Sequence, residues 1–97
     1  MRIIARQPLK AFWERHPDVE GFLRQWLAQT RAALWKGPAD IRRMHATPSF
    51  LGEIRVVFNV KGNRYRLVVH VRYDLARGYV RFVGTHAEYD RIDAQKV

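Results

Sequence analysis

The chain of 97 residues contains no cysteine, which excludes disulfide bridges, thiolate zinc ligands and cysteine nucleophiles. Its four histidines are dispersed, and neither an H-x₃-H nor an H-E-x-x-H pair occurs, so the sequence predicts no metal site. Neither glycine motif of nucleotide-binding proteins, G-x-G-x-x-G or the Walker sequence, is present. We therefore expect a protein that uses no cofactor.

Long apolar runs are also missing. No stretch approaches the roughly 20 apolar residues of a membrane span, and the apolar run at the N-terminus is too short for a signal peptide. The length allows one domain, 1–97, and a chain that is 47% hydrophobic is too apolar for a disordered basic tail. We expect a folded cytoplasmic protein with no membrane contact.

Acidic residues are scarce. Nine Asp and Glu stand against 18 Lys and Arg, which gives a net charge of +9, and 14 of the 18 are Arg. The planar guanidinium fork matches phosphate oxygens bidentately, so an excess of Arg over Lys favours a phosphate-containing partner. No basic amphipathic helix or lipidation motif indicates a membrane surface. Nucleic acid is the predicted partner.

The first half of the chain predicts two helices. Arg2–Arg6 is a candidate strand, and Leu9–Arg15 is a candidate short helix. A longer helix starts near Val19 and is stopped by Gly37, because its apolar residues follow the i, i+3, i+4, i+7 spacing of one buried face. That face comprises Val19, Phe22, Leu23, Trp26, Leu27, Thr30, Ala33 and Leu34.

Residues 38–52 show no sustained period and are predicted to be mostly irregular, with a helical turn at Ala39–Met44 as the alternative. Trp13 lies off the helical pattern and is expected to be an exposed aromatic. The aromatics assigned to the core are Phe12, Phe22, Trp26, Trp35, Phe58 and Phe82.

The second half has the period of strands. Alternating residues over 54–61, a turn at Gly62-Asn63 and a long strand over 64–73 predict a hairpin. A third strand over 79–84 and a short helix from Thr85 follow. The sequence therefore predicts an α+β domain: a short N-terminal strand and two N-terminal helices packed on an antiparallel meander, with a short C-terminal helix.

The long strand predicts one apolar face and one basic face. The core face comprises Tyr65, Leu67, Val69, Val71 and Tyr73, and the other comprises Arg64, Arg66, Val68, His70 and Arg72, with Lys61 at the hairpin tip and Arg81 on the next strand. Cations on neighbouring same-face positions repel each other, which favours a bound phosphate chain. A solvated outer face is the alternative, and the stripe alone leaves both open.

The string G-T-H-A-E-Y-D at residues 84–90 combines a structural and a chemical signal. Thr85 and Glu88 have the spacing of a capping box. His86, Tyr89 and Asp90 fall on one helix face, where they can contact each other or a shared ligand. Proton transfer by His86 and a purely structural histidine at a helix start are both compatible with this pattern.

Two strings resemble a known family. Residues 57–69, V-F-N-V-K-G-N-R-Y-R-L-V-V, and residues 79–90, Y-V-R-F-V-G-T-H-A-E-Y-D, are similar to HigB-type toxins of the RelE and ParE superfamily. The start M-R-I-I and the segments 12–17 and 38–41 extend the resemblance to nearly the whole chain. It implies a RelE-like fold and the toxin of a type II toxin-antitoxin pair, an endoribonuclease that cleaves mRNA on the translating ribosome.

The resemblance also implies a HigA-like antitoxin with a helix-turn-helix domain. The toxin-antitoxin complex would contact operator DNA only through this antitoxin. Cleavage without metal requires attack by the ribose 2′-hydroxyl, a base, an acid and cations for the phosphorane charge. The residues implied for catalysis are Lys61, Arg66, His86 and Tyr89, with Asp90 orienting His86; those implied for RNA binding are Asn63, Arg64, His70, Arg72 and Arg81. A gyrase poison and a noncatalytic basic RNA-binding module are the alternatives.

Overall fold

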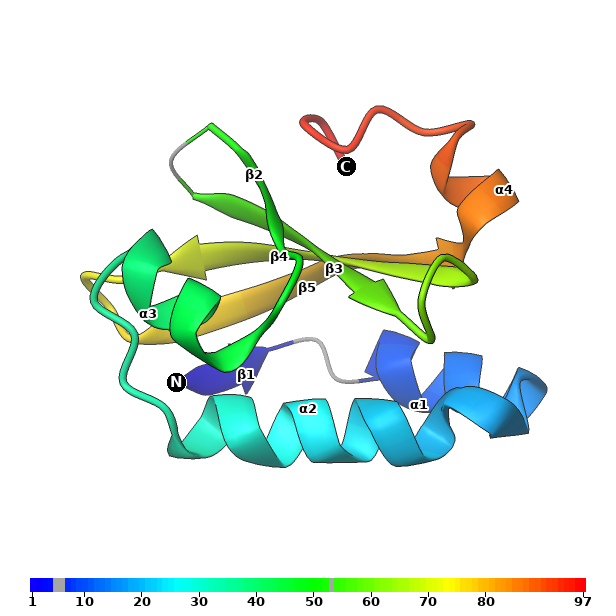
Figure 1. Cartoon of the computed structure of the whole chain (residues 1–97), viewed down its shortest axis with the longest axis horizontal. Coiled ribbons are helices and arrows are strands. Elements are labelled where there is room, and N and C mark those ends of the chain that lie inside the picture. The colour runs from blue at the N-terminus through cyan, green and yellow to red at the C-terminus, as the bar shows by residue number, and fades with distance from the viewer. Residues whose placement is uncertain (5–6, 53) are drawn as a thin grey trace.

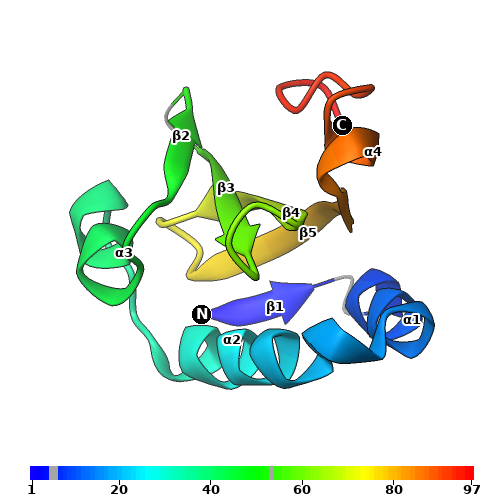
Figure 2. The same ribbon diagram turned by 45° about the vertical axis from the view of Figure 1, so that its right-hand side comes forward.

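The structure, a computed structural model, describes residues 1–4, 7–52 and 54–97. A five-stranded sheet of order β1-β5-β4-β3-β2 carries α1 and α2 on one face, and α4 with the C-terminal segment on the other (Figures 1 and 2). The elements are β1 (Arg2–Ile4), α1 (Gln7–Arg15), a 3₁₀ turn η1 (Pro17–Val19), α2 (Glu20–Ala32), α3 (Pro38–Met44), β2 (Ser49–Leu51), β3 (Arg55–Val60), β4 (Tyr65–Arg72), β5 (Arg77–Thr85) and α4 (His86–Tyr89). The predicted α+β class is confirmed.

The sheet is mixed, which corrects the expected antiparallel meander. β3, β4 and β5 do form the predicted meander, with Val60 opposite Tyr65 at the hairpin. β1 joins it in parallel beside β5, with Ile3 opposite Gly78. The helices separate β1 from the other strands in the sequence, so β1 reaches the far edge of the sheet by a crossover. Residues 5 and 6 of the predicted first strand lie outside the described residues.

The helical layer buries the main core. Trp26 and Leu23 of α2 and Phe12 of α1 pack with Phe58 and Leu67 of the sheet. Thr30 of α2 is also buried, as its position in the stripe predicts. None of the described helices is long and apolar enough to cross a membrane.

Two predictions about the helical half are wrong. Trp13 is buried rather than exposed, because α1 packs against both α2 and β5 and so buries more than one face. Arg24 of α2 lies over its indole ring, 4.9 Å from the ring centroid. Leu34, assigned to the buried stripe, is 67% exposed because α2 ends at Ala32 and the chain continues extended from Ala33.

The segment expected to be mostly irregular contains a helix, which agrees with the alternative of a helical turn at Ala39–Met44, and a strand that was not expected. α3 has Pro38 at its start and buries Ile41. β2 pairs with the first half of β3, with Phe50 opposite Val56. Both elements are too short to develop a sequence period, so packing against the sheet determines their structure.

The face of the sheet opposite α1 and α2, called the outer face below, has its own small apolar cluster. Val57, Val68 and Ala94 are buried there. Phe82 packs in this cluster rather than in the main core to which the sequence assigned it, because it lies opposite Val68 on β5. The C-terminal segment crosses above this face (Figure 1). The outer cluster therefore divides the predicted basic face into two separate polar regions.

Candidate functional site

The first polar region lies where α4 meets the hairpin, and it is called the α4 patch: Asn63, Arg66, His86, Tyr89 and Asp90. The capping box predicted from the sequence is present, since Glu88 N donates to Thr85 Oγ1 and Thr85 N donates to Glu88 Oε1. The backbone N–H of His86 donates to the carbonyl of Arg64 at 2.8 Å. These bonds fix the start of α4 against the hairpin.

Arg66 is the central cation of the α4 patch. It is only 9% exposed, and its guanidinium donates to Asn63 Oδ1 and to the carbonyl of Tyr65, both at 3.1 Å. Among the described residues no carboxylate forms an ion pair with it. A guanidinium has five N–H donors, so these two contacts leave donors for an anion. Burying an unpaired charge is costly, and a bound phosphate would offset that cost.

Tyr89 packs beside Arg66. The guanidinium carbon of Arg66 lies 5.9 Å from the centroid of the Tyr89 ring, and that ring lies 6.3 Å from Phe82. Gly84, opposite Arg66 on β5, makes this packing feasible, because a Cβ there would come within 2.5 Å of the Phe82 ring. The aromatic ring therefore holds the cation from the side of α4.

His86 and Asp90 lie next to each other, as their i, i+4 spacing predicts. His86 Nδ1 is 3.5 Å from Asp90 Oδ2, and the two side chains are 50% and 58% exposed. A carboxylate at this position can orient the imidazole ring. Both side chains are therefore open to a ligand from solvent.

Two residues predicted for the site do not join the α4 patch. Lys61 sits at the hairpin tip with a φ of 54°, and its side chain is exposed. Arg64 extends toward η1, where its guanidinium is 3.9 Å from Asp18. Asp18 also accepts a hydrogen bond from the hydroxyl of Tyr65 at 3.0 Å. Arg64 is therefore partly neutralised on the side of the helical layer.

The second polar region, called the far patch, lies across the outer cluster from α4: Arg55, His70, Arg72, Tyr79 and Arg81. Arg55, His70 and Tyr79 are directly opposite one another on β3, β4 and β5. The register of β5 shifts at Arg81, an exposed residue whose guanidinium lies 5.6 Å from the Tyr79 ring centroid. Three of the five side chains are therefore cations on one surface.

Charge crowding affects His70. Burial, followed by the positive charges of Arg55, Arg81 and Arg72, lowers the pKa of His70 below its usual 6.5. Arg72 has its own counterion, because it binds Asp74 through two hydrogen bonds of 2.9 and 3.1 Å. This pairing lowers the pKa of Asp74. The far patch thus contains a neutral histidine among guanidinium groups, of which only Arg72 pairs with an Asp or Glu side chain among the described residues.

Sequence reasoning missed Arg55 and Tyr79. Strand pairing is symmetric about the hairpin turn, so Val60 opposite Tyr65 places Arg55 opposite His70. The position of Arg55 could therefore have been predicted from the hairpin register. Arg55 also donates to the main-chain oxygen of Val97. That contact joins segments far apart in the sequence and has no local signal.

A group of three or more His, Asp or Glu side chains placed to hold a metal ion is not found in the described part of the chain. A scan against protein-family models matches residues 19–92 to HigB_toxin, the RelE-like toxic component of a toxin-antitoxin system. The chain belongs to this family. The match spans most of the chain, including both polar regions of the outer face. A comparison with curated proteins finds no significant match.

Membership of the HigB toxin family confirms the resemblance read from the two sequence strings. The chain is the toxic component of a toxin-antitoxin system, and a toxin of this kind pairs with an antitoxin. Its α+β architecture, with helices on one face of a small sheet and a short C-terminal helix, is consistent with a RelE-like fold.

Proposed function

We propose that this HigB-family toxin is an endoribonuclease that cleaves translated mRNA on the ribosome through attack of the ribose 2′-hydroxyl on the adjacent phosphodiester. The observation that carries the proposal is the nearly buried Arg66, which has no carboxylate partner among the described residues. Its remaining donors, aimed at a phosphate, would stabilise the charge that develops on the phosphorane. The net charge of +9 supports a polyanionic substrate.

The proposed roles follow from the positions of the side chains. His86 moves the proton as general acid or base, and Asp90 orients it at 3.5 Å. Tyr89 holds Arg66 and offers its ring or hydroxyl to the substrate. Asn63 positions the guanidinium by accepting its hydrogen bond. No step in this scheme requires a metal ion.

The outlying cations bind the RNA backbone in this proposal. Lys61 at the exposed hairpin tip adds charge near the cleaved phosphate, and Arg64 adds charge beside it. On the far patch, Arg72, Arg81 and His70 contact phosphates further along the strand. Such contacts add salt-dependent affinity without reading sequence.

The proposed partners are a HigA-like helix-turn-helix antitoxin, mRNA and the ribosome, all in the cytoplasm, with operator DNA reached only through the antitoxin. The test is expression of the wild type and of a double variant, Arg66→Ala with His86→Ala, in cells without the antitoxin. We expect that only the wild type arrests growth and creates new mRNA 5′ ends within translated codons.

Two results would contradict this activity. Growth arrest by both proteins without new 5′ ends would favour a target such as gyrase, which a supercoiling assay with purified gyrase detects. Salt-sensitive RNA binding by the wild type without cleavage or growth arrest would indicate a noncatalytic RNA-binding module.

A further inference from the structure

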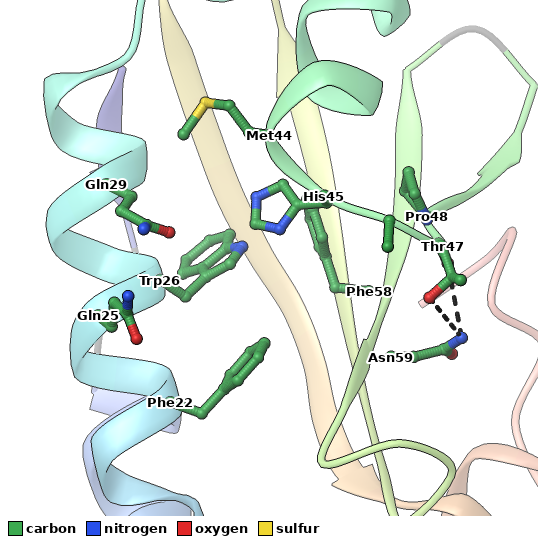
Figure 3. A pocket seen from close by; sticks show the side chains of 11 residues that line it. Phe22, Gln25, Trp26, Gln29, Met44, His45, Thr47, Pro48, Phe58 and Asn59 are labelled. Carbon is green, nitrogen blue, oxygen red and sulfur yellow. Dashed lines mark hydrogen bonds between the residues drawn. The ribbon is translucent and has the colours of Figure 1, made fainter.

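A hollow of about 290 Å³ lies between α2, the connection from α3 to β2, and β3 (Figure 3). The rings of Phe22, Trp26, His45 and Phe58 form its walls, with His45 4.8 Å and Trp26 5.5 Å from Phe58 between ring centroids. None of the described residues that line it is Asp, Glu, Lys or Arg. Flat walls without formal charge fit a neutral planar group rather than an ion.

Two polar atoms in these walls are shielded from solvent and have no hydrogen-bond partner among the described residues: Trp26 Nε1 and His45 Nε2. Trp26 is only 1% exposed. The indole N–H can only donate, whereas burial lowers the pKa of His45, so its ring is neutral and has one accepting and one donating nitrogen. Unpaired groups of this kind are costly, and an occupant with both an acceptor and a donor would satisfy them once the His45 ring turns to open both atoms to the hollow.

The hollow lies on the helical side of the sheet, and only the edge of β3 separates it from the α4 patch on the outer face. Asn59 lines it and is directly opposite Arg66 across the β3–β4 pair, where Cα atoms are separated by about 5 Å. β2 pairs with β3 only at Arg55–Val57, so in the described sheet Phe58 and Asn59 are on a free strand edge. Asn59 Nδ2 donates to Thr47 Oγ1 at 3.3 Å, which holds the loop beside the opening (Figure 3).

We propose that this hollow binds one nucleobase of the RNA strand whose phosphate lies on Arg66. A base splayed out of a single strand offers two flat faces to the aromatic rings and an edge on which a donor and an acceptor are adjacent. The exposed amides of Gln25 and Gln29 at the rim lie within reach of its other polar atoms. The inference rests on the proposed RNA substrate and adds a base-binding subsite to it.

The indole N–H resonance of Trp26 tests the proposal in ¹⁵N-labelled toxin. Wild type is titrated with a 2′-O-methyl RNA hexanucleotide, which cannot be cleaved by 2′-hydroxyl attack, and with an abasic chain of the same length. We expect the hexanucleotide to move the Trp26 resonance, and the abasic chain to leave it in place. Trp13 and Trp35 serve as internal references, and Trp→Phe variants of each assign the three signals.

Two matched variants measure the contribution of the hollow. His45→Phe keeps a ring but removes the accepting nitrogen, and we expect about fivefold weaker binding of the hexanucleotide, the effect of one hydrogen bond. Gln29→Ala removes a rim amide without touching the core and should weaken binding in the same direction. Gln7→Ala, on the exposed start of α1, should leave the affinity unchanged.

Several outcomes overturn the base-binding subsite. A Trp26 resonance that stays in place contradicts the base-binding subsite, even if the hexanucleotide binds elsewhere on the protein. This result is expected if the occupant of the hollow is a side chain of the antitoxin. An equal shift with the abasic chain contradicts recognition of the base. If either of these two results is obtained and the wild type still cuts mRNA in cells, the base-binding subsite is wrong and the proposed function stands. Absence of mRNA cleavage by wild type instead overturns the proposed function.

Discussion

The two ends of the outer sheet face both present guanidinium groups but differ in how these side chains are held. In the α4 patch, Arg66 is nearly buried and oriented by Asn63, Tyr65 and Tyr89. In the far patch, Arg81 is exposed and contacts the face of an aromatic ring. A cation fixed by several contacts can stabilise a specific developing charge, whereas a mobile one adds general attraction for phosphate.

The histidines differ in the same way. His86 has a carboxylate neighbour in Asp90 and is half exposed, so it can exchange protons with solvent or a ligand. Burial, followed by the surrounding guanidinium groups, lowers the pKa of His70. We infer that the α4 patch performs the chemistry and that the far patch binds the substrate.

The largest expected effect is that of His86→Gln. Removing a general acid or base should lower the rate constant of RNA cleavage by about 10²- to 10⁴-fold. The capping box of Thr85 and Glu88 does not use the imidazole, so α4 should persist in the circular dichroism spectrum. The matched control is His70→Gln, expected to change the rate less than tenfold. Equal losses would remove the distinction between the two ends.

Arg66→Met should lower the rate by about 10²- to 10³-fold, the usual cost of losing one donor to a developing oxyanion. Because the substitution replaces a buried, unpaired charge with an apolar chain, the free energy of unfolding should stay the same or increase. Denaturant unfolding and single-turnover cleavage measure the two effects. A strongly destabilised variant would show that Arg66 serves the fold instead.

Val68→Ala tests whether the outer cluster contributes to stability. Val68 and Val69 are adjacent on β4, point to opposite faces and are both fully buried. Each substitution removes two buried methyl groups, which should lower the free energy of unfolding by about 2 kcal/mol. Urea denaturation of the two variants measures this. A loss below about 0.5 kcal/mol for Val68 alone would mean that the outer face is open to solvent.

Arg81→Gln should weaken binding of a noncleavable RNA and reduce its salt dependence. If this exposed side chain contacts one phosphate, the slope of log affinity against log salt concentration should decrease by about 1. Fluorescence anisotropy at several salt concentrations provides the slope. The control is Arg24→Gln, because Arg24 is paired with Glu20. An unchanged slope would exclude the far patch from RNA binding.

The smallest effect concerns pH. His70 has a lowered pKa in the folded protein, while in the unfolded chain it titrates near 6.5. Below about pH 6.5 the unfolded chain therefore binds more protons, and the stability of the wild type should fall as the pH decreases. His70→Gln should lose less stability than wild type between pH 8 and 5. Added inorganic phosphate should reduce this difference in stability between the wild type and His70→Gln. Identical pH profiles of the two proteins would contradict the prediction.

The parts of the fold that were predictable have local signals. The apolar spacing of α2, the alternation in β3 and β4, and the Thr85–Glu88 capping box each depend on residues within a few positions of one another. Burial of Trp13 was not predictable, because it results from contacts of α1 with both α2 and β5. The strand β2 was not predicted for a similar reason, since it is too short to show a period, and α3 was expected only as the alternative of a helical turn at Ala39–Met44.

In the candidate site, too, the features with local signals were predictable and those that depend on tertiary contacts were not. The sequence placed His86, Tyr89 and Asp90 on one helix face and Arg66 on the outer face of the sheet, because helix and strand periods are local. It could not place Tyr89 against Arg66, because that contact depends on how α4 turns back over the start of β4. It also predicted one continuous basic stripe.

The sequence by itself determined the basic character, the alternating strand faces, the capped final helix and the resemblance to HigB toxins. Only the tertiary structure decided that Ala94 and Phe82 cover Val68 and split that stripe, and that Trp26 meets His45 around a hollow. The physical reason is that periodicity records which side of an element is apolar. Which segment covers that side is decided when residues distant in the sequence pack together.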